Sequence, residues 1–387
     1  MKMRMTQLKT IADIQTGPFG SQLHKEDYVE TGTPIVTVEH LGNRVFTEQN
    51  LPRVSDSDKA RLIKYTLSTG DIVFSRVGSV DRCSYVDKSH DGWMFSGRCL
   101  RVRPTELVDS LYLYYYFCLE ETKQFVRNIA VGATMPSINT KLLGEVEIAL
   151  PDLNNQKRIA AVLSSLDDKI ENNQKLNDNL ADLLQTIYQE RFSNDILAVN
   201  QGVLSDICSY SRDKVAVSEL NVSTYFSTEN MLSGKAGSTE ATSLPTTSQT
   251  TACHKGDTLI SNIRPYFKKI VYCEGNCGCS TDVLCFTPSQ PRYSTYLFST
   301  LYADKFFVFM VAGSKGTKMP RGDKQQIMTY PVVLPSEEEL ARFNTIASPL
   351  LEQIYSNRAE NKRLSILRDT LLPKLMSGEI DVSAVQL

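Results

Sequence analysis

The stretch that decides the fold is Gly70-Asp71-Ile72-Val73-Phe74-Ser75, because a similar stretch, Gly256-Asp257-Thr258-Leu259-Ile260-Ser261, follows 186 positions later. A second landmark repeats in the same order, since Met135-Pro136 returns as Met319-Pro320, 184 positions later. Similarity at a nearly fixed period is the signature of an internal duplication. The chain of 387 residues is therefore predicted to contain two copies of one unit.

The two copies are expected to share one layout of short strands and an apolar helix. Strand-like runs such as Thr33–Val38 are broken by Gly, Pro, Asn and Asp. One apolar and aromatic helical segment follows in each copy, at Leu111–Phe125 and Tyr293–Val311. We interpret its Tyr and Phe residues as core rather than as stacking platforms for bases. Each copy then closes on a strand stopped by proline, at Leu150-Pro151 and Leu334-Pro335, which predicts a mixed α/β class.

Composition fits a folded protein and gives little indication of the partner. The hydrophobic fraction of 41 % supports buried cores, and no stretch approaches the ~18 consecutive apolar residues of a membrane span. The start of the chain lacks a signal-peptide core, so a cytoplasmic location is expected. The formal net charge is −2, so a nucleic-acid binder of this composition must gather its Lys and Arg on one face.

A long amphipathic helix is predicted after each closing proline. Apolar residues recur at alternating spacings of four and three, which is a heptad seam. In the first helix the seam is Ile159, Leu163, Leu166, Ile170, Asn173, Asn177, Leu180, Leu184 and Ile187. In the second helix it is Phe343, Ala347, Leu350, Ile354, Asn357, Asn361, Leu364, Arg368, Leu371 and Leu375.

The seam asparagines predict that the two helices pair antiparallel within the chain. Buried asparagines in a seam cost stability and act as register markers that require a polar partner. In the antiparallel register Asn173 meets Asn361 and Asn177 meets Asn357, while every other layer but one is apolar. The exception is Arg368 opposite Leu166, whose charged end is expected to extend outward. A parallel pairing would instead place Asn173 beside Asn357.

These features divide the chain into five predicted segments. The globular copies are residues 1–150 and 193–334, and each precedes a spacer helix, at residues 151–192 and 335–376. Residues 377–387 form a tail. About 35 helical residues span about 50 Å, which would place one globular domain at each end of the helix pair.

The cysteines leave two interpretations open. Their number is nine, which is odd, and their spacing is not that of a disulfide scaffold. Cys253-His254, Cys273, Cys277 and Cys279 match no common zinc spacing, so reduced structural thiols are favoured over a metal site. The flanking runs Ile270–Tyr272 and Val283–Phe286 are expected to form a hairpin.

No catalytic motif was found in the sequence. It contains no Asn-Pro-Pro-aromatic methyltransferase motif and no phosphate-binding loop of the GxxxxGK[ST] type. The four histidines, His24, His40, His90 and His254, form no pair with metal or acid–base spacing. No catalytic or metal-binding residue is therefore assigned.

Four stretches resemble the specificity subunits of type I restriction-modification systems. They are Ala12–Leu23, Gly70–Ser79, Leu150–Leu163 and Gly256–Pro265. The third is similar to the central spacer of that family, with Asn155 where Glu is usual. The second copy departs further, because Pro335–Leu340 lacks the Gln of the family pattern.

This resemblance implies two target-recognition domains separated by two long helices that form an antiparallel coiled coil. It further implies a non-catalytic subunit that recognises two short sequences in double-stranded DNA. Methyltransferase subunits would dock on its helices, and restriction subunits would join through the complex. S-adenosylmethionine, ATP and Mg would be used by those partners, with no cofactor in this chain and no membrane contact.

Candidate DNA-binding residues lie in loops that carry Arg, Lys, Asn, Gln and Ser, the side chains that contact base edges and phosphates. In the first domain they are Gln22, His24, Lys25, Arg76, Ser79, Arg82, Thr134, Ser137 and Asn139. In the second domain they are Asn262, Arg264, Tyr266, Lys268, Lys269, Lys315, Lys318, Arg321 and Lys324. The segment Ser314–Lys324 is the most basic of the chain, and its glycines would let the backbone approach phosphates.

Three other functions remain open from the sequence. The nearest is the specificity subunit of a related system whose methyltransferase and nuclease are one polypeptide. A two-headed adaptor that binds proteins through a coiled coil would fit the neutral charge. A stand-alone nuclease would need a metal-binding carboxylate cluster, which the sequence lacks.

Overall fold

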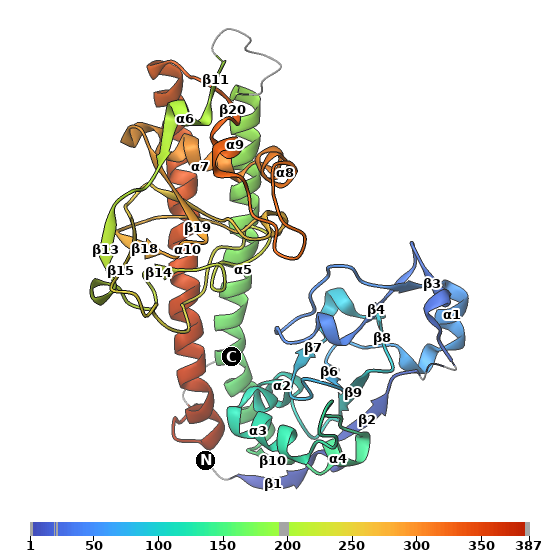
Figure 1. Cartoon of the computed structure of the whole chain (residues 1–387). Helices are drawn as coiled ribbons and strands as arrows, with labels where there is room; N and C mark the ends of the chain where they lie inside the picture. The colour runs from blue at the N-terminus through green and yellow to red at the C-terminus, as the bar shows by residue number, and fades with distance from the viewer. Residues whose placement is uncertain (1–2, 19, 21, 193–200, 384–387) are drawn as a thin grey trace. The chain divides into compact units, whose positions relative to one another are not determined.

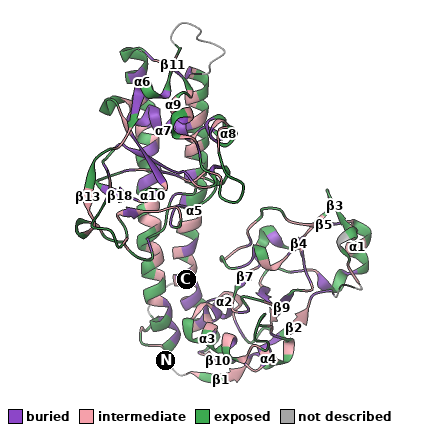
Figure 2. Ribbon diagram, in the orientation of Figure 1, coloured by how far each residue is buried: buried purple, intermediate pink, exposed green. Residues whose placement is uncertain are grey.

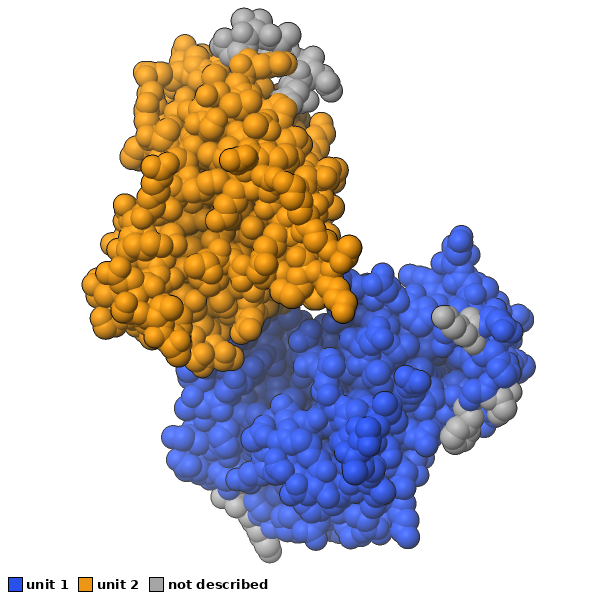
Figure 3. Space-filling view, in the orientation of Figure 1, with its two compact units in different colours: residues 1–171, 361–387 blue, residues 172–360 orange. Residues whose placement is uncertain are grey.

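The computed structural model describes residues 3–18, 20, 22–192 and 201–383, with the side chain of Lys25 also outside the description. The chain forms two compact units (Figure 3). Unit 1 is Met1–Glu171 with Asn361–Leu387, and unit 2 is Asn172–Glu360. Each unit thus contains one globular copy and part of both long helices. The predicted boundary at residue 193 and the end of the predicted tail, residues 384–387, lie outside the described residues, as do Phe19 and Ser21.

An antiparallel four-stranded sheet forms the inner part of unit 1 (Figure 1). Its order is β2 (Ala12–Thr16), β9 (Cys99–Pro104), β6 (Ile72–Ser75) and β7 (Cys83–Tyr85). All four residues of β6 are buried. Successive side chains of a strand point to opposite faces, so the continuous apolar run of β6 indicates a sheet covered on both sides.

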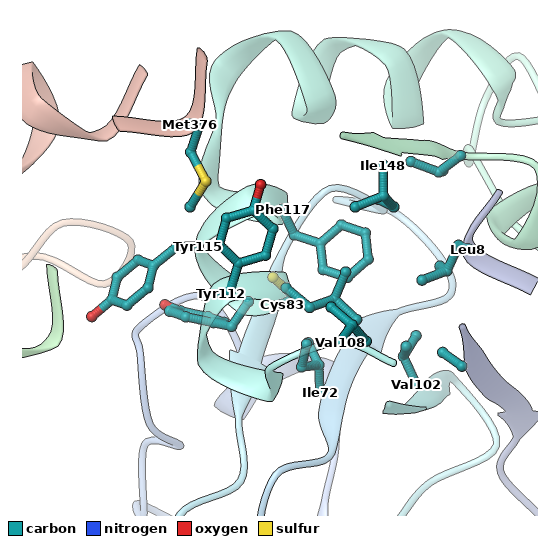
Figure 4. Packing of buried hydrophobic residues seen from close by; sticks show 14 of the residues in the cluster. Leu8, Ile72, Cys83, Val102, Val108, Tyr112, Tyr115, Phe117, Ile148 and Met376 are labelled. Atoms are coloured by element: carbon teal, nitrogen blue, oxygen red, sulfur yellow. The ribbon is translucent and has the colours of Figure 1, made fainter. Parts of the chain in front are cut away.

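Two cores cover the two faces of this sheet. Ile72 and Phe74 belong to the larger core, whereas Val73 between them belongs to a second one. The larger core is built on α2 (Ser110–Cys118), which contributes Phe117 (Figure 4). Phe117 contacts Phe74 edge to face at a centroid distance of 4.7 Å. Met376, near the end of the chain, also lies in this core.

Short elements complete unit 1. A second sheet has the order β3 (Tyr28–Val29), β5 (Arg53–Val54), β4 (Thr33–Val36) and β8 (Met94–Phe95). The strands β1 (Arg4–Gln7) and β10 (Glu147–Leu150) form an antiparallel ladder. The remaining helices are α1 (Asp56–Arg61), α3 (Glu120–Ile129) and α4 (Thr140–Gly144).

Unit 2 repeats the inner sheet and the closing ladder of unit 1, and its second sheet has a different strand order. Its inner sheet has the order β12 (Cys208–Tyr210), β19 (Val283–Pro288), β16 (Thr258–Ser261) and β17 (Ile270–Tyr272). The second sheet is β13 (Lys214–Ala216), β15 (Gln249–Cys253), β18 (Cys277–Cys279) and β14 (Tyr225–Phe226). The ladder of β11 (Gln201–Val203) with β20 (Pro331–Val333) matches that of β1 with β10. Its helices are α6 (Leu204–Ile207), α7 (Ser294–Tyr302), α8 (Asp304–Ala312) and α9 (Lys324–Met328).

Buried tyrosines confirm that the two units are structural copies. The Tyr112 hydroxyl donates a 2.6 Å hydrogen bond to the Ala149 carbonyl. The Tyr296 hydroxyl donates a bond of the same length to the Val333 carbonyl. The first bond joins α2 to the closing strand β10, and the second joins α7 to the closing strand β20. The predicted duplication and the mixed α/β class are therefore confirmed.

Two sequence-based expectations were wrong in detail. The single apolar helix of each copy is two helices, because the backbone is extended at Leu119 and at Ala303. The predicted hairpin of Ile270–Tyr272 with Val283–Phe286 does not form, since both β17 and β19 pair with β16 instead. The intervening β18 belongs to the second sheet, so the connection leaves the inner sheet before returning to it.

The long helices are α5 (Leu153–Phe192) and α10 (Glu337–Ser377), and they pair antiparallel within each unit. In unit 2 the Asn357 side-chain amide donates to the Asn177 side-chain carbonyl at 2.8 Å. In unit 1 the Asn361 amide donates to the Ile170 carbonyl at 3.1 Å. Figure 2 shows buried and exposed residues in turn along both helices, as a two-helix seam requires.

The predicted register holds for the buried Asn177–Asn357 pair. Asn173 is also buried, and its amide donates to Glu360 at 2.7 Å. A direct bond between Asn173 and Asn361 stays a prediction. The Asn177–Asn357 and Asn173–Glu360 contacts exclude the parallel arrangement, in which Asn357 would meet Asn173.

The expectation that Arg368 extends outward was wrong. Its guanidinium donates to the Asp167 carboxylate at 2.6 Å, and the Tyr115 hydroxyl donates to the same carboxylate at 2.7 Å. Asp167 is 5 % exposed, so the charge at this layer is buried and paired. The partner was missed because Asp167 stands beside the heptad seam rather than on it.

None of the helices among the described residues is long and apolar enough to cross a membrane.

Candidate nucleic-acid interface

In unit 1 the structure joins two loops that lie about sixty positions apart in sequence. The first follows β6 and contains Arg76 and Ser79, and the second contains Thr134 and Ser137. The Gly78 amide donates to the Pro136 carbonyl at 2.8 Å, and the Ile138 amide donates to the Arg76 carbonyl at 2.9 Å. These two bonds hold candidate residues from both loops on one surface.

Unit 2 joins the corresponding loops with the same two bonds. The Arg264 amide donates to the Pro320 carbonyl at 2.8 Å, and the Gly322 amide donates to the Asn262 carbonyl at 3.3 Å. Because this pairing occurs in both units, we call it the loop clamp. The loop clamp is made of Arg76–Gly78 with Pro136–Ile138 in unit 1, and Asn262–Arg264 with Pro320–Gly322 in unit 2.

A third segment lies beside the loop clamp of unit 1. The Gly17 amide donates to the Cys99 carbonyl at 3.2 Å, and a Cβ atom at Gly17 would lie 2.1 Å from the Ser96 oxygen. The Arg76 guanidinium donates to the neighbouring Gly97 carbonyl at 3.2 Å. Only glycine fits so close to the Ser96 backbone. The start of the glycine loop and the segment after β6 therefore both contact the turn at Ser96–Gly97.

The glycine-loop candidates have structural contacts of their own. The Gln22 side-chain carbonyl accepts a 2.7 Å hydrogen bond from the Tyr65 hydroxyl, which fixes this amide. His24 is exposed, and its backbone amide donates to Asp27. Lys25 follows directly, but its side chain lies outside the described part of the chain.

Several candidate lysines and arginines of unit 2 form ion pairs within the unit. Lys315 pairs with Asp323 at 2.5 Å, Arg321 with Asp282 at 3.1 Å, and Lys268 with Asp304 at 3.0 Å. Exposed ion pairs contribute only about 0–1 kcal/mol, so phosphate groups would compete for these cations at little cost. Lys269 differs, because its ammonium donates to the Thr228 carbonyl and burial lowers its pKa.

Other candidate cations are exposed and form no ion pair among the residues that the structure describes. Arg264, Lys318 and Lys324 are of this kind in unit 2, and Arg82 in unit 1. They can reach a phosphate or a base edge without first breaking an internal pair.

Backbone strain marks the turn that follows Arg264. Arg264 and Lys268 have φ values of 50° and 51°, in the left-handed region that non-glycine residues rarely adopt. Such strain of about 1 kcal/mol or more persists at functional sites when the surroundings enforce it. The turn presents Tyr266, half exposed, against Phe267 at a ring distance of 4.8 Å. Phe267 was not among the residues predicted from the sequence, although its position next to Tyr266 indicated it.

Two candidate asparagines support the loops from within. Asn139 caps α4 by accepting the Leu142 amide at 2.9 Å. Asn262 is 6 % exposed, so its side chain lies beneath the loop surface rather than on it. This burial disfavours direct contact between Asn262 and a base. We predict instead that Asn262 supports the loop from beneath. Ser79 and Thr134 are exposed at the loop surface, whereas Ser137 is half-buried.

The cysteine cluster lies in the second core of unit 2. Cys253, Cys273, Cys277 and Cys279 are buried there as free thiols, and the Cys273 and Cys277 sulfurs are 3.6 Å apart. Among the described residues no group of three or more His, Cys, Asp or Glu side chains is arranged to hold a metal ion.

Comparison with known proteins gives one family. Residues 2–181 match the model of the type I restriction modification DNA specificity domain. The type I restriction enzyme MjaIX specificity subunit of Methanocaldococcus jannaschii is 24 % identical over 323 residues, which are 72 % of this chain and 71 % of that protein. The HindI specificity subunit of Haemophilus influenzae is 26 % identical over 158 residues, 40 % of this chain and 34 % of that protein.

A solved structure shares the fold over nearly the full length. The crystal structure of a type I restriction-modification system S subunit from M. genitalium has a TM-score of 0.60 and 18 % identity. The match covers 97 % of this chain and 96 % of that chain.

Proposed function

Because this chain belongs to the family of type I restriction-modification specificity subunits, we propose that it recognises a two-part sequence in double-stranded DNA. Each unit would contact one part through the surface of its loop clamp. The two units differ in the residues that they present there, so the two parts of the target differ as well. As a specificity subunit, the chain itself is not an enzyme.

The observation that carries this proposal is the loop clamp in both units. It joins loops with polar and basic side chains beyond the end of an inner strand of the sheet, and it occurs twice in one chain. Base-specific contacts need side chains held in fixed register, and phosphate contacts need exposed cations. Arg264 and Lys318 supply exposed cations in unit 2, and Arg82 supplies one in unit 1.

The proposal extends to partners and cofactors. Methyltransferase subunits would bind the paired helices α5 and α10, and restriction subunits would join through them. S-adenosylmethionine, ATP and Mg would be bound by those partners, and DNA methylation and cleavage would occur there. A single partner polypeptide that carries both activities would identify the related fused system instead.

The decisive experiment maps methylated adenines in cells that express the chain with its methyltransferase partner, and in the same cells without the chain. The expected result is a single two-part motif that is methylated only when the chain is present. Methylation that persists without the chain, or a continuous one-part motif, would contradict the proposal.

A further inference from the structure

Two exposed methionines, Met135 and Met319, directly precede the prolines of the two loop clamps and belong to matching hairpin loops. Residues Val131–Ser137 close by two reciprocal backbone bonds, of 2.9 and 2.8 Å. Residues Lys315–Arg321 close by two reciprocal bonds of 2.9 Å each. Both loops have the pattern Gly-x-x-Met-Pro, and Gly132 and Gly316 have φ values of 113° and 102°. The two loops therefore have the same backbone structure in both units.

The fold explains the repeated glycine but not the repeated methionine. The glycine adopts a backbone conformation that other residues rarely reach, and the carbonyl of the proline accepts the bond of the loop clamp. The methionine side chain is 64 % exposed at Met135 and 49 % exposed at Met319. It fills no core, so its recurrence in both copies indicates contact with something outside the chain.

The surroundings of these methionines favour a nucleic acid as that partner. Met319 stands between Lys318 and the Pro320–Arg321 segment, and Lys315 is 81 % exposed in the same loop. Met135 lies on the loop that is clamped to Arg76–Gly78, and the exposed Arg82 follows that segment by four positions. An apolar tip among cations matches the design of proteins that place apolar side chains against or between base pairs while cations hold the phosphates. Methionine suits this position because its flexible thioether adapts to flat aromatic surfaces.

We propose that Met135 and Met319 are apolar wedges that pack against a base step of the target DNA, one in each part of the sequence. This inference rests on the proposed DNA-recognition function. The wedges add affinity and register without adding charge. The neighbouring Lys and Arg supply the salt-dependent part of binding.

The test uses the full chain with the subunits that co-purify with it, and a duplex selected by the wild-type protein from a random-sequence DNA pool. Met135→Ala/Met319→Ala should lower affinity for this duplex about tenfold to a hundredfold, because each side chain loses a buried apolar contact. The slope of affinity against salt should stay unchanged, since no cation is removed. Met135→Leu/Met319→Leu should restore most of the affinity.

The matched control is Val308→Ala, which removes an apolar side chain of α8 that is 67 % exposed. It should bind like the wild type. Unchanged affinity in the double alanine variant would overturn the inference. Intact DNA binding with loss of the co-purifying subunits would also overturn it, because the methionines would then contact protein. If the wild-type complex selects no sequence at all, the proposed function fails rather than the wedge.

Discussion

The second sheets of the two units share three segments and differ at their edges. In unit 1, β8 pairs in parallel with β4, and its Met94 forms an antiparallel bridge with Thr66. In unit 2, β18 pairs in parallel with β14 and antiparallel with β15, where Ala252 faces Gly278. Thr66 and Ala252 are 186 positions apart, the period of the duplication, so these three segments are equivalent.

The extra strands join opposite edges of this shared part. Unit 1 adds β5 and then β3 beside β4. Unit 2 adds β13 beside β15. The inner sheets and the loop clamps have the same order and bonds in both units. The inner sheet and the loop clamp, which position the candidate interface, are therefore the same in both units, whereas the second sheet differs.

The cores behind the second sheets differ in the same way. The core of unit 1 contains the rings of Phe46, Tyr65 and Phe95. That of unit 2 has nine buried members, and five of them are cysteines. A cysteine is a small hydrophobic side chain, so this core buries less apolar surface per residue.

The largest expected loss of stability concerns the inner sheets, which have corresponding strand orders in the two units. Phe74→Ala in unit 1 should lower the free energy of unfolding by about 3–5 kcal/mol, and Ile260→Ala in unit 2 by about 2–5 kcal/mol. Both side chains are fully buried in the main core of their unit. Urea unfolding followed by circular dichroism measures both changes. A loss below about 1 kcal/mol in only one unit would contradict the view that the inner sheets are equivalent.

The next prediction concerns the difference in stability loss between the second cores of the two units. Phe95→Ala should destabilise unit 1 by about 3–5 kcal/mol, whereas Cys279→Ala should cost unit 2 only about 1 kcal/mol. Both residues are buried without exposure, so only the size of the removed group differs. The same unfolding experiment compares them. Equal losses would show that the thiol core is as important for stability as the aromatic one.

The seam asparagines predict an effect of about 1–3 kcal/mol. Asn357→Leu leaves the buried Asn177 amide without its 2.8 Å partner, which costs the desolvation of that group. Asn177→Leu/Asn357→Leu removes both polar groups and should be close to neutral in stability. Thermal unfolding of the single and double variants forms the test. A double variant that is less stable than the single one would disprove a mutual pair.

Arg264 offers a comparison within the loop clamp, because unit 1 has Gly78 at the equivalent position. Arg264→Gly should stabilise unit 2 by about 1 kcal/mol, since glycine adopts a positive φ without strain. The same change should cost about 1–3 kcal/mol of discrimination at one base position. Thermal unfolding and methylation mapping measure the two effects. Unchanged sequence preference would remove Arg264 from the base contacts.

The smallest expected effect is electrostatic. Lys315→Ala/Lys318→Ala should weaken binding to all DNA sequences about equally and reduce the salt slope by about 2 at most. Binding titrations at several salt concentrations measure this slope. An unchanged slope would exclude this loop from phosphate contact. Lys214→Ala, which removes an exposed lysine of β13, serves as the control variant.

A large part of the fold was predictable from the sequence. The duplication, the closing strands before Pro151 and Pro335, both long helices and the Asn177–Asn357 layer follow from periods that are written locally in the chain. Strands of only two residues, such as β5 and β14, were not predictable, because such short runs carry no pattern of their own. The candidate interface was predicted as separate loops, and their residues stay candidates.

The sequence by itself determined the repeat, the seam and the loops that carry cations, because each is recognised from the pattern of residues within short stretches of the chain. Only the tertiary structure decided that Arg76–Gly78 meets Pro136–Ile138, that Arg368 meets Asp167, and that β17 and β19 flank β16. These contacts join residues far apart in sequence, and their geometry follows from how the sheets and helices pack. The exposed methionines became informative only then, since burial, which distinguishes a core side chain from a free one, is a property of the folded chain.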